Sequence, residues 1–121
     1  MKANELRIGN YVDYYGNIVT INSVNENDVG FSDYVPIDYP LLTEIEPIPL
    51  TEDWLVRFGF EKINTTWYAY KRGVFRLNIS FDVEWVNNWM GIRLKHVHQF
   101  QNIYFALTGQ ELEIISPTPY Q

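Results

Sequence analysis

A segment with two prolines, Glu46-Pro47-Ile48-Pro49, divides the chain into two parts that fold differently. Proline has no backbone N–H, so two prolines two residues apart cannot both lie in a central strand. We therefore expect an edge strand or an extended connector at this point. Residues 1–48 and 49–121 then form two subdomains. We expect them to pack together as one compact unit, because 121 residues is the length of one ordinary domain.

The first part, residues 1–48, contains five short segments rich in β-branched and aromatic residues, which favour strands. These segments span residues 11–15, 18–24, 29–31, 35–37 and 43–46. The pair Gly16-Asn17 between the first two segments is typical of a two-residue hairpin turn. Five short strands expose many unpaired edges, and closure into a barrel removes most of them. We therefore expect an SH3-like small β-barrel over residues 1–48.

The second part, residues 49–121, begins with a short predicted helix over residues 52–58. Thr51 is a favourable N-cap residue, and Gly59 suits the left-handed position that follows a helix. Further predicted strands form an antiparallel β-meander and span residues 60–63, 66–71, 74–81, 83–86 and 89–95. The predicted fold class is therefore α+β and β-rich, with the short helix before the meander and a C-terminal helix packed on it.

The C-terminal helix is predicted over residues 98–108, and Gly109 is its expected stop. At about 100° per residue, five apolar side chains fall within an arc of roughly 120°, which is an ordinary core stripe. These are Val97, Phe100, Ile103, Tyr104 and Leu107. A separate face of the same helix carries what we call the His98 strip, spaced i, i+3, i+4 and i+7. Its members are His98, Gln101, Asn102 and Phe105.

The His98 strip is open to two interpretations. Three of its side chains can both donate and accept hydrogen bonds, and a phenylalanine beside them is unusual for a purely solvated surface. In the first interpretation the polar groups cap loop carbonyls and Phe105 covers a barrel edge. In the second interpretation the strip recognises a partner. The burial or exposure of these side chains decides between the two.

The chain has two histidines, His96 and His98, and no cysteine. Side chains two residues apart share a face only in a strand. Since His96 is predicted to end a strand and His98 to lie in the helix, we expect them to form neither a pair nor a metal clamp. The sequence also lacks a nucleophile elbow and a glycine-rich phosphate loop. We therefore expect no catalytic residues, no metal and no cofactor.

Charge is distributed unevenly along a chain whose net charge is −6. Residues 1–50 carry two basic and eight acidic residues, whereas residues 57–95 carry seven basic and three acidic residues. The basic region also holds a candidate platform for single-stranded nucleic acid, made of Tyr68, Tyr70, Arg76, Arg93 and Lys95. The overall acidity disfavours that partner, because it repels phosphate groups. No signal-like or membrane-length apolar segment is present, so we expect a cytoplasmic protein without a membrane partner.

Three stretches of the sequence are distinctive: NELRIGNYV, EIEPIPLTEDWLVRFGFEK and VHQFQNIYFALTGQEL. They resemble a family of small uncharacterised proteins found in gut-bacterial genomes and in their phages or mobile elements. The resemblance covers most of the chain, and its most specific block is the His-Gln-x-Gln-Asn-x-Tyr-Phe-Ala-Leu-Thr-Gly run at residues 98–109. Residues 60–92 are not distinctive. The resemblance implies a bacterial or phage cytoplasmic protein, and it supplies no activity and no catalytic residues.

These observations predict a non-enzymatic binding or accessory module with a protein partner. The candidate partner-binding residues are His98, Gln101, Asn102, Phe105, Tyr68, Tyr70 and Arg76. Single-stranded nucleic-acid binding through the aromatic and basic sheet face is the alternative. A small hydrolase-type enzyme is the second alternative, and no recognisable constellation of nucleophile, base and oxyanion donor supports it.

Overall fold

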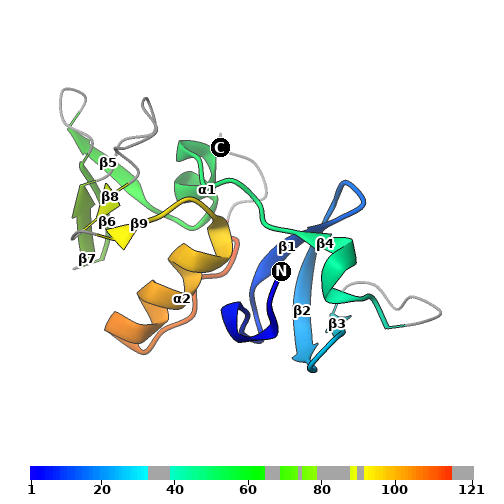
Figure 1. Cartoon of the computed structure of the whole chain (residues 1–121). Coiled ribbons are helices and arrows are strands. Elements are labelled where there is room, and N and C mark those ends of the chain that lie inside the picture. Colours follow the sequence, from blue (N-terminus) through cyan, green and yellow to red (C-terminus); the bar gives the residue numbers. More distant parts are fainter. Residues whose placement is uncertain (33–38, 65–68, 74, 79–87, 90–91, 116–121) are drawn as a thin grey trace. The chain divides into compact units, whose positions relative to one another are not determined.

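The computed structural model describes residues 1–32, 39–64, 69–73, 75–78, 88–89 and 92–115 (Figure 1). The chain divides into two compact units. Unit 1 contains residues 1–49 and 96–111, and unit 2 contains residues 50–95 and 112–121. The C-terminal helix thus groups with the N-terminal strands, whereas we expected it to pack on the meander. That the two parts form one compact unit stays a prediction.

Unit 1 is built on a four-stranded antiparallel sheet in the order β3-β2-β1-β4. The strands are β1 (Tyr11–Tyr14), β2 (Asn17–Val24), β3 (Val29–Phe31) and β4 (Ile45–Glu46). Val12 pairs with Val19 across β1 and β2, and Asp13 pairs with Glu46 across β1 and β4. In the part of the chain that the structure describes, β3 and β4 are the two edges. The sheet is therefore open, and the predicted SH3-like barrel is not confirmed.

The edge at β4 is short for a local reason. The segment predicted as a strand over residues 43–46 starts within a 3-10 turn, η2 (Leu42–Glu44), and only two residues are extended. Pro47 follows directly and lacks the N–H that a longer ladder needs. The predicted strand over residues 35–37 lies outside the described residues. A second 3-10 turn, η1 (Ala3–Glu5), precedes the sheet.

The core of unit 1 lies on one face of this sheet. Its buried members come from all four strands and from the segments beside them: Leu6, Val12, Val19, Ile21, Val29, Phe31, Leu42 and Ile45. Val12 and Val19 are cross-strand partners, and Ile21 follows Val19 by two residues, so the three side chains point to the same face. Alternation in β2 therefore selects the buried face.

Helix α2 (Val97–Thr108) completes unit 1 and lies beside β1 (Figure 1). Its first residue is bound to the segment that follows β4, because the Val97 N–H donates to the Ile48 carbonyl (2.9 Å). Gly109 ends the helix with φ 74°, and its N–H donates to the Phe105 carbonyl (2.8 Å). This confirms the predicted glycine stop.

The predicted core stripe of α2 is confirmed in its first two turns. Val97, Phe100 and Tyr104 are buried, and Ile103 is half-buried. Leu107 is 53% exposed, so its assignment to the core is wrong. The helix periodicity places Leu107 on the stripe, but the last turn of the helix extends beyond the buried region.

Unit 2 begins with α1 (Glu52–Arg57), close to the predicted helix over residues 52–58. Thr51 occupies the N-cap position with extended backbone, although its side chain makes no capping hydrogen bond. The helix ends in two hydrogen bonds: the Gly59 N–H donates to the Val56 carbonyl, and the Phe60 N–H donates to the Leu55 carbonyl. Gly59 has φ 88°. This is a Schellman C-cap, the arrangement that favours glycine after a helix.

Two antiparallel sheets follow α1 in unit 2. The larger contains β5 (Glu61–Asn64), β6 (Ala69–Arg72) and β7 (Phe75–Asn78), and the smaller contains β8 (Asn88–Trp89) and β9 (Ile92–Arg93). Trp89 pairs with Ile92 in the smaller sheet, so the prediction of a single strand over residues 89–95 is wrong. The strand predicted over residues 83–86 lies outside the described residues. In the described part of the chain, no helix is long and apolar enough to cross a membrane.

Candidate interaction site

The two histidines lie at the start of α2. His96 is the N-cap residue, and its backbone N–H donates to the side-chain oxygen of Gln99 (3.0 Å). His98 lies inside the helix, as predicted. Their rings are nevertheless stacked, with centroids 5.8 Å apart and planes 12° from parallel. The expectation that the histidines form no pair is therefore wrong: the extended backbone of the N-cap brings the His96 ring alongside the His98 ring.

His98 is buried, with 2% of its surface exposed. Its Nδ1 has no hydrogen-bond partner among the described residues, and its Nε2 lies 3.9 Å from a carboxylate oxygen of Glu5. Burial lowers the pKa of His98, the neighbouring His96 lowers it further, and Glu5 opposes both. The imidazole is therefore neutral near pH 7. Among the described residues, no group of three or more His, Asp or Glu side chains is arranged to hold a metal ion.

Gln101 and Asn102 join α2 to the N-terminal segment, residues 5–11. The fully buried Gln101 side chain accepts a hydrogen bond from the Tyr11 N–H and donates one to the Gly9 carbonyl, both at 2.9 Å. Asn102 accepts from the side-chain amide of Asn10 (2.8 Å) and donates to the Glu5 carbonyl (2.9 Å). We call these four hydrogen bonds the amide clamp. Each amide uses its donor and its acceptor on the segment that leads into β1.

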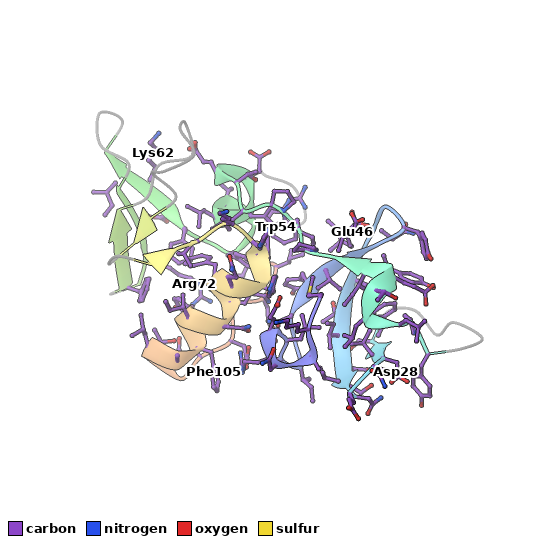
Figure 2. The ribbon with its side chains drawn as sticks, viewed as in Figure 1. Asp28, Glu46, Trp54, Lys62, Arg72 and Phe105 are labelled. Carbon is purple, nitrogen blue, oxygen red and sulfur yellow. The ribbon has the colours of Figure 1, made fainter. Side chains whose placement is uncertain are left out.

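Phe105 lies one turn further along α2 (Figure 2) and is 36% exposed. The Arg7 guanidinium lies 3.9 Å from the centroid of its ring, which is cation–π geometry. The same guanidinium forms a two-point ion pair with Glu111, just beyond the helix. Arg7 therefore bridges the last turn of α2 and the segment after it to the N-terminal segment.

The contacts of the His98 strip support the internal interpretation. His98 and Gln101 are buried, and Gln101 and Asn102 hold loop backbone, as the first interpretation requires. Phe105 contacts the Arg7 guanidinium and stays partly exposed. The buried Gln101 amide, which is hydrogen-bonded internally, is not available to a partner. Gln101 and Asn102 of the strip hold the N-terminal segment, and partner binding by the strip stays a prediction.

The predicted aromatic and basic platform lies only partly within the described residues. Tyr68 lies outside them, while Tyr70 belongs to β6 and Arg76 to β7. The strand register pairs Tyr70 with Leu77 and Lys71 with Arg76. Tyr70 and Arg76 are therefore on neighbouring strands but are not cross-strand partners.

Sequence reasoning missed an exposed tyrosine at the tip of the β1–β2 hairpin. Tyr14 pairs with Asn17, so the turn residues are Tyr15 and Gly16 and not the predicted Gly16-Asn17. Both turn residues have positive φ, 49° for Tyr15 and 84° for Gly16, as a type I′ turn requires. Tyr15 is the one described residue other than glycine with positive φ, and its side chain is 70% exposed. Asp13 is the residue in the sequence that could have indicated this turn, since aspartate side chains often bind backbone N–H groups in turns. Its carboxylate accepts a hydrogen bond from the Gly16 N–H (2.7 Å).

Glu44 holds the Tyr15 ring in place. One carboxylate oxygen accepts a hydrogen bond from the Tyr15 hydroxyl (2.9 Å), and the other accepts one from the Leu41 N–H (2.9 Å). The hydrogen bond to Glu44 raises the pKa of Tyr15, and the backbone hydrogen bond from Leu41 is the main cause that lowers the pKa of Glu44. The Tyr14 ring lies edge-on to the Tyr15 ring at 4.7 Å. We call Tyr14, Tyr15, Leu41 and Glu44 the hairpin patch.

The hairpin patch combines exposed apolar surface with a fixed negative charge. Leu41 is 49% exposed, whereas Tyr14 packs against the core of unit 1 and anchors the patch to it.

Compared with known proteins, the chain matches no family model, and no curated protein and no solved structure matches it.

Proposed function

We propose that this chain is a non-enzymatic protein-binding module of the cytoplasm, with unit 1 as the binding unit and the hairpin patch as its contact surface. The observation that carries this proposal is the conformation of Tyr15. An aromatic residue with positive φ is a steric outlier. Strained residues that persist in a fold are candidates for function.

The turn itself gives no reason for a tyrosine. Type I′ turns favour Asn-Gly and Asp-Gly, because asparagine and aspartate tolerate the left-handed region. The Tyr15 ring is mostly exposed, so burial of its apolar surface does not offset the strain. The hydrogen bond to Glu44 fixes the direction of the ring instead of covering it. An exposed and immobilised aromatic ring is the kind of anchor that binding surfaces use, since it loses little conformational entropy on association.

The amide clamp supports this proposal through rigidity. Residues 5–11 lead directly into β1, and β1 ends in the Tyr15 turn. Holding this segment against α2 fixes one flank of the hairpin strand. Elements held in this way lose less entropy on binding than mobile loops do. In this proposal the His98 strip acts as internal support for a surface on the opposite end of β1.

The origin that the resemblance implies, a gut-bacterial genome or its phages or mobile elements, belongs to the same proposal. The specific block at residues 98–109 is the part of α2 that carries the amide clamp. A distinctive block of sequence is expected where side chains form an internal hydrogen-bond network, because few residue types have the geometry that the hydrogen bonds require. This restriction applies whatever partner the module binds.

A peptide-selection experiment on the full chain tests the proposed function. A library of random linear peptides is selected against the wild-type chain, and the enriched peptides are then measured against Tyr15→Asn and Ile8→Asn. Asn is favoured at the turn position, so Tyr15→Asn keeps the fold while removing the ring. Ile8 is 64% exposed and lies within the N-terminal segment, before β1, so Ile8→Asn is the matched control for loss of exposed apolar surface.

We expect peptides that bind the wild type and Ile8→Asn but not Tyr15→Asn. If no peptide is enriched, or if the enriched peptides bind all three chains equally, the proposed function is wrong. A single-stranded oligonucleotide is measured in parallel. If it binds at low salt and does so equally well with Tyr15→Asn, the result favours the nucleic-acid alternative.

A further inference from the structure

The charges around the hairpin patch restrict what can bind there. Unit 1 carries nine acidic residues and two basic ones, Lys2 and Arg7. Arg7 is committed to Glu111 and Phe105. Unit 1 therefore has few basic side chains with which it could attract an acidic partner.

Two further carboxylates belong to the strands at the patch. Asp13 of β1 and Glu46 of β4 are cross-strand partners, and Figure 2 labels Glu46 on β4. Like charges in directly opposite positions destabilise a sheet. None of Asp13, Glu44 and Glu46 forms an ion pair with any residue that the structure describes. The hairpin thus places three uncompensated carboxylates close to one exposed aromatic anchor.

Glu44 can still accept hydrogen bonds. A carboxylate has about four acceptor positions. Tyr15 and Leu41 use one on each oxygen. The depressed pKa keeps Glu44 ionised well into the acidic range. A tyrosine ring beside an ionised carboxylate offers a cation both a π-face and an ion-pair partner.

We propose that the hairpin patch binds a cationic segment of a partner protein, with a lysine or arginine side chain that lies on the Tyr15 ring and pairs with Glu44. This inference rests on the proposed function and names the partner's chemistry. Nucleic acid and anionic lipid surfaces are excluded as occupants of this patch by the same charges, because both present phosphate groups to three carboxylates. An acidic or neutral peptide cannot form an ion pair with Glu44, Asp13 or Glu46.

The experiment uses one arginine-containing peptide from the selection, or an Arg-Gly repeat peptide if none of the enriched peptides contains arginine. It is compared with the same peptide in which every arginine is replaced by citrulline, which has nearly the same shape and no charge. Binding is measured by fluorescence anisotropy with the full chain. We expect the citrulline peptide to bind at least about tenfold more weakly, the order expected for one desolvated cation–π or ion-pair contact.

Chain variants locate the effect. Glu44→Gln removes the charge: its amide oxygen can still accept from the Leu41 N–H, and its amide NH2 can donate to the Tyr15 hydroxyl oxygen. It should weaken binding of the arginine peptide but not of the citrulline peptide. Glu26→Gln is the control of equal charge change, since Glu26 is exposed in the turn at the opposite end of β2. We expect Glu26→Gln to bind as the wild type does. Amide NMR spectra of all variants establish that they are folded.

The outcomes separate the two proposals. If selected peptides need Tyr15 but bind equally well with citrulline, the inference of a cationic partner is overturned and the proposed function survives. If Glu44→Gln and Glu26→Gln weaken the arginine peptide equally, the attraction is non-specific charge and the assignment of Glu44 is overturned. If arginine peptides bind Tyr15→Asn as tightly as wild type, the hairpin patch is not the binding surface and both proposals are wrong.

Discussion

Replacing Gln101 with methionine tests the amide clamp directly. Methionine has a similar length and volume, so Gln101→Met removes two hydrogen bonds with little change in packing. The Tyr11 N–H and the Gly9 carbonyl then lose their partners. Each buried backbone group left without a partner costs about 1–3 kcal/mol. The Gly9 carbonyl is only partly buried, so we expect a loss of about 2–4 kcal/mol in the free energy of unfolding of unit 1.

The assay has to report on unit 1 alone. All four tryptophans lie between residues 50 and 95, so tryptophan fluorescence follows unit 2. Amide hydrogen exchange at Ile21 follows unit 1, because the Ile21 N–H donates to the Asn10 carbonyl inside the sheet. A loss of about 2–4 kcal/mol corresponds to exchange that is about 30 to 900 times faster. Gln110→Met, at an exposed position after the helix, is the matched control and should change little.

Two results would refute the reasoning. If Gln101→Met lowers the free energy of unfolding by less than about 0.5 kcal/mol, the clamp is not a significant source of stability. If Gln110→Met accelerates exchange at Ile21 as much as Gln101→Met does, the effect belongs to methionine and not to the lost hydrogen bonds.

Three further predictions concern other parts of the fold. The pKa of His98 is lower in the folded state, so the unfolded state binds the proton more tightly, and the stability that neutral His98 contributes should be lost as the pH falls below about 6.5. The urea midpoint should therefore fall more between neutral and mildly acidic pH in wild type than in His98→Gln. An equal fall in both proteins would contradict this. Gly109→Ala should cost about 1–2 kcal/mol because of its positive φ alone, and Gly59→Ala should cost more, since a Cβ there would also lie 2.7 Å from the Ile115 side chain; equal shifts in thermal midpoint would show that the contact is relieved without cost. Arg7→Lys keeps the charge but loses the two-point pair with Glu111 and the planar contact with Phe105, so it should destabilise by about 0.5–1.5 kcal/mol, a loss that urea unfolding followed by exchange at Ile21 would detect.

The features that were predicted from the sequence are those fixed by local chemistry. Gly59 and Gly109 end their helices as expected, because left-handed C-cap positions favour glycine wherever the helix lies. The spacing of Gln101 and Asn102 identified a polar face on α2 that is separate from the core stripe. Its role could not be read from that spacing, since its partners lie about 90 residues away in the chain.

Two errors have physical causes. A turn at Gly16-Asn17 and one at Tyr15-Gly16 both place apolar residues opposite one another in β1 and β2, so hydrophobic alternation did not discriminate between the registers. The usual preference against a left-handed tyrosine then favoured the wrong turn. The barrel was predicted by counting short strands, but only two residues before Pro47 pair with β1. Counting strands overestimates closure where proline shortens an edge.

The amide clamp also has a consequence for synthesis on the ribosome. The strands of unit 1 are made first, but Gln101 follows Tyr11 by 90 residues. At about 5–20 residues per second, translation of that interval takes roughly 5–18 s. During this time β1 has been made but the helix that satisfies its Tyr11 N–H has not, so the N-terminal fifty residues emerge as an incomplete unit. Rare codons or a pause within residues 50–95 would lengthen this vulnerable interval without altering a single contact of the finished protein.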